Sequence, residues 1–368
     1  MTMDRRTLLI SGAALSAAAV APRVLAADAT FAPRPGGWRS FQTTMRLDIA
    51  KPRGVSQAWV PLPSVNEPDW FRPLGNDWRT NAASAVVYRD PKYGAELLHV
   101  TWADGESAPT VEVVSQFATR DRGLDLSKPG KAAPLSAAER TLYTAPTSLI
   151  PIDGIVKDTS DYVTAGARTE LAKARAIYEW SVDNTFRDPK TRGCGFGDIA
   201  SMLQMGNLGG KCADLNALYV GLARAAGLPA RDVYGVRVAP SRFGYKALGA
   251  GSENVTKAQH CRAEVYVSRY GWVPVDPADV RKVVLEEPPG NLALGDLKVA
   301  AARSALFGAW EMNWLAYNTA HDLVLPGARN PAADFVMYPQ AETGGERLDS
   351  LDPDSFKYTI MAKELTSA

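Results

Sequence analysis

The stretch from 206 to 231, "GNLGGKCADLNALYVGLARAAGLPAR", places a cysteine directly after a glycine-rich turn and at the start of an expected helix. After Cys212, apolar side chains recur at the i, i+3, i+4, i+7 and i+11 spacing of an amphipathic helix. Gly227 and Pro229 then end it, as a C′ glycine followed by a proline does. The stretch therefore predicts a helix over 212–226 with Cys212 in its first turn.

The predicted position of Cys212 gives its side chain a specific chemistry. The first turn of a helix leaves backbone N–H groups unpaired and carries a partial positive charge, so a thiolate there is stabilised and its pKa falls. Gly209 and Gly210 allow the preceding backbone to approach a substrate closely, and the unpaired N–H groups can stabilise an oxyanion that forms beside the sulfur. We predict that Cys212 is a nucleophile, with a small buried core cysteine as the alternative.

His260 is the histidine best placed to act as the base for this thiol. The two strand-like runs that follow it flank a turn, which predicts a β-hairpin. Antiparallel pairing across that turn places His260 opposite residues 276–280, a window that contains Asp276 and Asp279. A carboxylate beside the imidazole holds it in one tautomer and stabilises its charged form. We favour Asp276, because it closes the second strand before Pro277 breaks it; the alternative for His260 is a hydrogen-bonded histidine at a strand end.

Three separated blocks of sequence, in order, resemble the transglutaminase-like superfamily, which has a papain-like Cys–His–Asp fold. They are "GGKCADLNALYVGLARAAGLPAR", "HCRAEVYV" and "GWVPVDPADV", and the resemblance spans residues 170–285. It implies that Cys212 is the nucleophile, His260 the base and Asp276 the orienting residue. The chain has no Gln-Cys-Trp segment at Cys212 and no acidic clusters that suggest calcium loops. The resemblance therefore implies a bacterial peptidase, amidase or acyltransferase rather than a protein-crosslinking enzyme.

The pattern along the chain predicts an α+β protein. Alternating apolar and β-branched residues dominate the first part, and helical periodicity takes over after a proline-rich stretch. After the leader we predict a β-rich N-terminal domain at 27–127, a linker at 128–153, a transglutaminase-like catalytic domain at 154–290, and a C-terminal helix and strand extension packing on the core at 291–368.

Three local predictions concern the flanking segments. The run "QAWVPLPS", 57–64, is predicted to be an edge strand, because Pro61 and Pro63 cannot donate to a neighbouring strand. The stretch 301–325 is predicted to be a late helix, because its aromatic residues recur at i, i+4 and i+7. The run "FKYTIMAKEL", 356–365, is predicted to be a closing strand.

Residues 1–26 are predicted to be a secretory signal. An arginine pair, Arg5 and Arg6, precedes an uninterrupted small and apolar run of 14 residues, which is shorter than the roughly 20 apolar residues that a spanning helix needs. The pair favours a twin-arginine signal, with an ordinary Sec signal as the alternative. Either signal predicts a periplasmic or secreted protein.

Composition argues against several classes of function. The 368 residues are 46% hydrophobic and 22% charged, with a formal net charge of +1. No basic run is present, so we expect no capture of nucleic acid or anionic lipid. No segment after the leader is apolar enough to span a membrane, and no motif indicates a cofactor or a metal.

The chain contains three cysteines: Cys194, Cys212 and Cys261. An odd number in an oxidising compartment leaves at least one thiol unpaired within the chain. Because His260 and Cys261 are neighbours in a strand, their side chains are expected on opposite faces, which turns Cys261 away from the site. We predict a disulfide between Cys194 and Cys261 and a free thiol at Cys212; the alternative is two independent reduced thiols.

Together these patterns predict an exported cysteine hydrolase or acyltransferase with a Cys-His-Asp triad. Its expected partner is a peptide, a protein or another amide-containing substrate. The expected reaction passes through a thioester, with hydrolysis favoured over transfer to an amine. The alternative is a non-catalytic binding module of the cell envelope on the same fold. The sequence indicates neither the identity of the substrate nor an oligomeric state.

Overall fold

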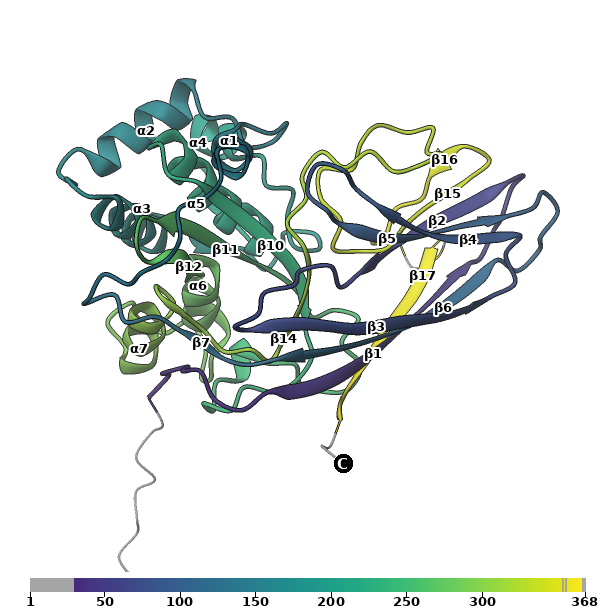
Figure 1. Ribbon diagram of the computed structural model, residues 1–368, viewed down its shortest axis with the longest axis horizontal. Helices are drawn as coiled ribbons and strands as arrows, with labels where there is room; N and C mark the ends of the chain where they lie inside the picture. The colour runs from purple at the N-terminus through teal and green to yellow at the C-terminus, as the bar shows by residue number, and fades with distance from the viewer. Residues whose placement is uncertain (1–29, 353, 355, 366–368) are drawn as a thin grey trace, which may run out of the picture.

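The computed structural model describes residues 30–352, 354 and 356–365. The predicted signal at 1–26 lies outside the described residues. The elements form a helix-rich part and a β-rich part that lie side by side (Figure 1). No helix in the described part of the chain is long and apolar enough to cross a membrane.

The β-rich part consists of two antiparallel sheets. Their strands are β1 (Arg39–Ile49), β2 (Ser56–Leu62), β3 (Phe71–Thr80), β4 (Ser84–Arg89), β5 (Glu96–Trp102), β6 (Thr110–Thr119), β15 (Gln340–Thr343), β16 (Glu346–Arg347) and β17 (Phe356–Leu365). One sheet has the order β17-β1-β6-β3 and the other the order β16-β15-β2-β5-β4. In β1, Phe41, Met45 and Leu47 alternate with more exposed neighbours, as a strand with one buried face requires.

The C-terminal strands are built into both sheets. β1 lies between β17 and β6, and β2 lies between β15 and β5. The predicted closing strand at 356–365 is confirmed as β17, which pairs with almost the whole length of β1. The C-terminal residues therefore complete the β-rich part and bring the end of the described chain next to its first strand.

The prediction of an edge strand at 57–64 is wrong, because β2 lies inside its sheet. β15 pairs only with residues 56–59 of β2, so residues 60–62 have β5 as their one strand neighbour. Pro61 thus lies past the end of β15, with a strand on one side. That local edge is what a proline in a strand requires, since it cannot donate to a second neighbour.

The helix-rich part contains a third antiparallel sheet. Its helices are α1 (Ala137–Thr144), α2 (Gly154–Thr164), α3 (Glu170–Asn184), α4 (Ile199–Met205), α5 (Cys212–Ala225), α6 (Pro277–Glu286) and α7 (Leu297–Ala305), with a short 3-10 helix at Lys246–Leu248. Its strands are β10 (Ala230–Arg237), β11 (Gln259–Val267), β12 (Gly271–Val275) and β14 (Trp314–Asn318), in the order β12-β11-β10-β14. Four further two-residue strands form two short pairs: β7 (Arg122–Gly123) pairs with β13 (Ala309–Trp310), and β8 (Phe186–Arg187) pairs with β9 (Gly209–Gly210). The predicted linker contains α1.

Helix α5 is the central helix of this part. It starts at Cys212, as the sequence predicts, and every one of its residues is buried. It packs against β11 on one side and against α2 and α3 on the other. A helix that is buried all round has its termini fixed by its surroundings, so the position of its first residue is well determined.

The predicted hairpin is confirmed as β11 and β12. Ala263 lies opposite Val275, and Tyr266 lies opposite Trp272. Because β12 ends at Val275, residues 260–262 of β11 have no β12 residue beside them. This stretch of β11 faces the N-terminal start of α5 and carries the predicted base, His260.

The predicted late helix at 301–325 is largely wrong. Helix α7 ends at Ala305, Gly308 takes a backbone φ of 120°, and Trp314–Asn318 forms strand β14 beside β10. All residues of β14 are buried. A strand buried on both faces shows no alternation, so its aromatic residues were open to a helical interpretation.

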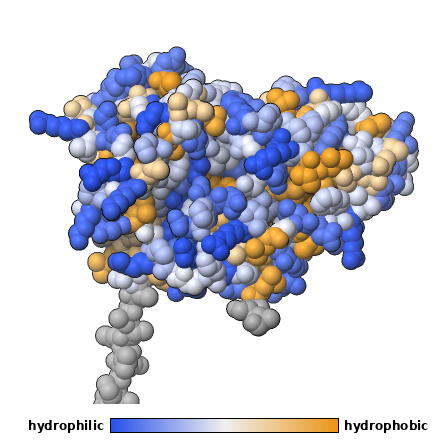
Figure 2. Space-filling model, viewed as in Figure 1, coloured by the Kyte–Doolittle hydropathy of each residue, from blue (hydrophilic) through white to orange (hydrophobic). Residues whose placement is uncertain are grey.

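The surface and the core agree with a folded globular chain. The face shown in Figure 2 is largely hydrophilic, with hydrophobic residues in separate patches. One cluster of buried apolar side chains includes Phe41 from the β-rich part and Leu218 from the helix-rich part, so the two parts share a continuous core.

Candidate active site

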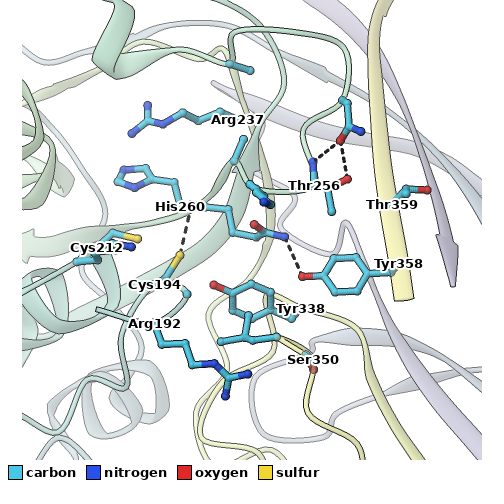
Figure 3. Close-up of a pocket in the computed structure, with 18 of the residues that line it drawn as sticks. Arg192, Cys194, Cys212, Arg237, Thr256, His260, Tyr338, Ser350, Tyr358 and Thr359 are labelled. Atoms are coloured by element: carbon cyan, nitrogen blue, oxygen red, sulfur yellow. Dashed lines mark hydrogen bonds between the residues drawn. The ribbon is translucent and has the colours of Figure 1, made fainter. Parts of the chain in front are cut away.

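A cavity of about 810 Å³ opens between the helix-rich part and β17 (Figure 3). Cys212 and His260 line one side of it, and Tyr338 and Tyr358 line the other. Its volume lies within the range of about 300–1,000 Å³ that is typical of ligand pockets. The predicted nucleophile and base therefore face a space that can hold a substrate.

Cys212 is the first residue of α5 and is 3% exposed. The backbone N–H of Ala213 donates to the carbonyl oxygen of Cys194 at 2.9 Å. One of the N–H groups at this helix start is therefore already paired. Among the described residues, no hydrogen bond engages the N–H of Cys212 itself, which leaves it as the available donor beside the sulfur.

Asp214 fixes the loop that precedes α4 against the start of α5. Its Oδ1 accepts from the backbone N–H groups at 196–197, at 3.0 and 2.9 Å, and its Oδ2 accepts from that of Lys211 at 3.0 Å. Gly195 has a φ of 93°, and a Cβ there would lie 1.8 Å from Asp214 Oδ2. A glycine is therefore required at 195 for the close contact between this loop and α5, which places Cys194 beside Cys212.

His260 and Asp276 meet at the uncovered end of β11. His260 Nε2 lies 2.7 Å from Asp276 Oδ2 and 3.4 Å from Asp279 Oδ2. All three side chains are buried. Both aspartates of the predicted window therefore reach the imidazole, and Asp276 makes the shorter contact.

Asn216 holds the second oxygen of Asp276. Asp276 Oδ1 accepts from Asn216 Nδ2 at 3.2 Å and from the backbone N–H of Asp279 at 3.0 Å. Asn216 also donates to the carbonyl oxygen of Cys261 at 2.8 Å. It lies one helical turn after Cys212 on α5, so it joins the helix of the thiol to the carboxylate. Sequence reasoning missed it, although a polar residue within an otherwise apolar helix was an available signal.

Two buried arginines face the pair of aspartates. Arg237 forms an ion pair with Asp279, and Arg262 Nε lies 3.6 Å from Asp276 Oδ2. Burial and the neighbouring charge of Asp279 raise the pKa of Asp276. Burial also acts to raise the pKa of Asp279, but Arg237 and His260 outweigh it and hold that pKa well below its usual range. Asp279 is therefore the fixed negative charge of the network.

The pKa of Cys212 is lowered well below its usual value of 9.0. The neighbouring thiols of Cys194 and Cys261 are the largest causes, and they outweigh burial, which raises the pKa. The Cys194 thiol itself donates to the carbonyl oxygen of Gln259 at 3.4 Å. His260 lowers it further through a hydrogen bond and through its charge. These groups favour the thiolate, which is the nucleophilic form of cysteine.

The pKa of His260 moves in the opposite direction. Burial and the charge of Arg237 lower it, but the carboxylates of Asp279 and Asp276 outweigh them and raise it to about 10. At neutral pH the two shifts together favour a thiolate at Cys212 beside an imidazolium at His260. This ion pair is the arrangement that a nucleophilic cysteine needs.

The predicted disulfide between Cys194 and Cys261 is absent, since all three cysteines are free and buried. Cys261 does not line the cavity, as expected for a side chain on the face opposite His260, but it lies near enough to Cys212 to lower the pKa of that thiol. Cys212 and burial raise the pKa of Cys194, and burial and then Cys212 raise that of Cys261.

His260, Asp276 and Asp279 also form a group whose ligand atoms lie within 4.8 Å of one another. A divalent cation there would meet the guanidinium groups of Arg237 and Arg262, which already face these carboxylates. Their positive charges oppose such a cation. The arrangement fits a protonated imidazole better than a metal ion.

Comparisons with known proteins agree with the fold. A family model described as the transglutaminase-like superfamily matches residues 157–277. An uncharacterized protein from Haemophilus influenzae is 37% identical over 343 residues, which cover 88% of this chain and 91% of that protein. A solved structure of a candidate cysteine protease from Cytophaga hutchinsonii covers 90% of this chain and 93% of its own, with a TM-score of 0.57 and 12% identity. This last likeness concerns the fold alone.

Proposed function

The chain belongs to the transglutaminase-like superfamily, and we propose that it is a cysteine-dependent hydrolase or acyltransferase acting on an amide or peptide bond. The observation that carries the proposal is the arrangement at Cys212. Its thiolate is stabilised by His260, whose Nε2 is held by Asp276 at 2.7 Å, and both Cys212 and His260 line the cavity.

In the proposed acylation, the Cys212 thiolate attacks the carbonyl carbon of the amide. A C–S bond forms, and the carbonyl electron pair moves to oxygen, where the N–H of Cys212 is the available donor. Because Nε2 of His260 faces Asp276, its Nδ1 carries the proton that passes to the leaving nitrogen. The C–N bond then breaks, which leaves a thioester on Cys212 and a neutral imidazole.

In the proposed deacylation, water attacks the thioester carbonyl while His260 takes its proton. The C–S bond breaks, the acid product leaves, and the thiolate and imidazolium are restored. A primary amine in place of water gives transfer instead of hydrolysis. Asp276 orients the ring in both steps and stabilises its charged form. We favour hydrolysis, because water is the nucleophile present when no amine is added.

We also propose that the protein is exported, to the periplasm or beyond it. The support is the signal-like sequence of residues 1–26 with its arginine pair. Fractionation of cells that express the full chain tests this: we expect the shortened protein outside the cytoplasm. Replacing both arginines with lysine should block export if the signal is of the twin-arginine type, and retention of export would indicate a Sec signal.

The experiment that tests the activity uses the purified mature chain with a pool of unlabelled peptides and mass spectrometry of the products. We expect hydrolysed products in water and a fraction of amine adducts when a primary amine such as hydroxylamine is added. Cys212→Ala should abolish both kinds of product. His99→Ala is the matched histidine control, because His99 hydrogen-bonds to Gln57 in the β-rich part, away from the cavity.

Each outcome of that experiment has a clear consequence. Full turnover by Cys212→Ala would reject the mechanism. Specific retention of peptides without any turnover by the wild-type chain would favour the alternative of an envelope binding module. Equal losses of activity in His99→Ala and His260→Ala would show that the assay reports folding rather than catalysis.

A further inference from the structure

The charged side chains that line the cavity all have one sign. Seven lysine and arginine side chains line it, and no aspartate or glutamate does so within the described residues. The whole chain has a formal net charge of only +1. The positive lining is therefore a local property of the cavity rather than a consequence of composition.

The deeper cations of the cavity are already compensated. Arg237 pairs with Asp279, and Lys282 and Arg187 share the carboxylate of Glu286. At the rim, a further arginine pairs with an aspartate of the C-terminal segment, Arg192 with Asp349 at 2.5 Å. In these ion pairs the positive charges of the arginines and of Lys282 are balanced by carboxylates, so they present little net charge to a ligand.

Three lysines of the lining are not compensated: Lys211, Lys257 and Lys357. None of them forms an ion pair within 4.0 Å with any carboxylate that the structure describes. Asp48 lies opposite Lys357 in the pairing of β1 with β17, but it binds Arg46 at 3.0 Å. These lysines are the net positive charge that a ligand in the cavity would meet.

The three lysines lie on two walls of the cavity that Cys212 also lines. Lys211 directly precedes Cys212, and Lys257 lies three residues before His260, both on the helix-rich part. Lys357 lies on β17, the opposite wall. A cleft with walls of one sign focuses the electrostatic field and raises the local concentration of ligands of opposite charge. Negative charges on either side of a carbonyl at Cys212 would each meet a lysine.

We propose that this cavity selects acidic peptides, with Asp or Glu side chains or a terminal carboxylate flanking the carbonyl that Cys212 attacks. The proposal rests on the proposed function for the position of that carbonyl. A peptide fits better than other polyanions, because the walls also offer apolar surface at Leu351 and Tyr358 beside the lysines. The lysines are then specificity-determining residues of the site.

Binding tests this proposal separately from turnover. The probes are three rhodamine-labelled decapeptides of alanine and glycine that carry three glutamates, three glutamines or three lysines. Fluorescence polarisation with the Cys212→Ala variant should show that the glutamate peptide binds about tenfold more tightly than the glutamine peptide, since each exposed charge contact contributes roughly a factor of two to three. The lysine peptide should bind most weakly. The preference should shrink as NaCl rises from about 0.1 M to about 1 M, where the screening length falls from about 10 Å to about 3 Å.

Charge-neutral variants assign the preference to the cavity. The double variant Lys257→Gln/Lys357→Gln should lose most of the preference for glutamate over glutamine. For the single variant Lys357→Gln, Lys363→Gln is the matched control with the same change of charge, because Lys363 lies on the same strand β17 but outside the cavity lining. It should keep the full preference. Equal effects of the two substitutions would show a nonspecific effect of net charge and overturn the proposal.

The outcomes separate this proposal from the proposed function. Equal affinity for the glutamate and glutamine peptides would overturn the acidic preference, even with normal peptide cleavage by the wild-type chain. A glutamate preference without cleavage of any peptide would keep the preference and reject the catalytic function. Tighter binding of a labelled acidic oligosaccharide than of the glutamate peptide would overturn the assignment of the ligand as a peptide.

Discussion

At the scale of single residues, the site depends on how three neighbours act on one sulfur atom. The thiols of Cys194 and Cys261 lower the pKa of Cys212 the most, burial raises it, and His260 lowers it again. Two buried thiols therefore contribute to the acidity of a third.

We expect three titratable thiols per chain. All three cysteines are free, so reaction of denatured, unreduced protein with a thiol reagent should give three equivalents. The count should be measured on protein purified without reducing agent. One equivalent would contradict the structure and restore the disulfide between Cys194 and Cys261.

Substitution of Asn216 should slow the reaction without weakening substrate binding to a similar degree. Asn216→Ala removes a donor from Asp276 Oδ1 and leaves that buried oxygen with the backbone N–H of Asp279 alone. Loss of a hydrogen bond to a buried charge costs about 1–3 kcal/mol, so kcat should fall roughly ten- to hundredfold.

The pH dependence of kcat serves as the control for Asn216, because a merely structural role of this residue would not change it. We expect the pH dependence of kcat to shift in Asn216→Ala, because Asp276 no longer stabilises the imidazolium of His260 to the same degree. An unchanged kcat and pH profile would remove Asn216 from the set of positioning residues.

At the scale of elements, the glycine-rich loop and the start of α5 form one unit. Gly195→Ala should destabilise the protein by about 1–3 kcal/mol more than Gly154→Ala. Both glycines have positive φ, 93° and 51°, but a Cβ at Gly195 would lie 1.8 Å from Asp214 Oδ2, whereas nothing lies within 4 Å of one at Gly154. Thermal unfolding of the two variants checks the difference. Equal melting temperatures would show that Asp214 does not fix the loop.

The sequence predicted the elements whose signals are local. Helix α5 has its own apolar spacing and its own glycine and proline stop, and the hairpin of β11 and β12 has its own turn, so both were predicted with the correct register. His260 and Asp276 came together because pairing across a turn can be counted from the sequence alone. The predicted site residues thus followed from short-range patterns and from the resemblance to a family.

The elements that the sequence failed to predict depend on distant partners. Strand β14 is buried on both faces and gives no alternation, and β2 lies inside its sheet because β15, nearly 300 residues later, pairs with it. The effect of Cys261 on the pKa of Cys212 depends on how β11 packs against α5. No pattern within a short window of sequence contains this information.

At the scale of the whole molecule, a buried ion cluster joins the two parts. Glu264 on β11 binds Arg122 from β7 at 2.5 Å and Arg231 from β10 at 2.6 Å, and Arg231 also binds Glu67, which lies between β2 and β3, at 2.9 Å. Burial raises the pKa of Glu264, but the two arginines outweigh it and lower that pKa. The cavity depends on this junction, because β17 belongs to the β-rich part and α5 to the helix-rich part.

Breaking this cluster should destabilise the whole fold. Glu264→Gln leaves Arg122 buried without its counter-charge, and loss of one partner of a buried ion pair costs about 3–5 kcal/mol. The matched control is Glu346→Gln, whose partner Arg53 and own side chain are each 70% exposed, and which should cost less than about 1 kcal/mol. Urea unfolding of both variants measures the difference. Similar midpoints for the two variants would show that the cluster does not hold the parts together.

The central claim is that the imidazolium of His260, together with the thiols of Cys194 and Cys261, stabilises Cys212 as a thiolate. The measurement that tests it most directly is the rate of Cys212 alkylation by iodoacetamide as a function of pH, followed by peptide mass spectrometry in the wild type and in His260→Ala. The pKa of Cys212 is lowered well below 9.0, and that of His260 is raised to about 10. We predict that the wild-type rate is already at its plateau at neutral pH, whereas His260→Ala reaches a plateau only at a distinctly more alkaline pH. Identical alkaline profiles for both proteins would contradict the account.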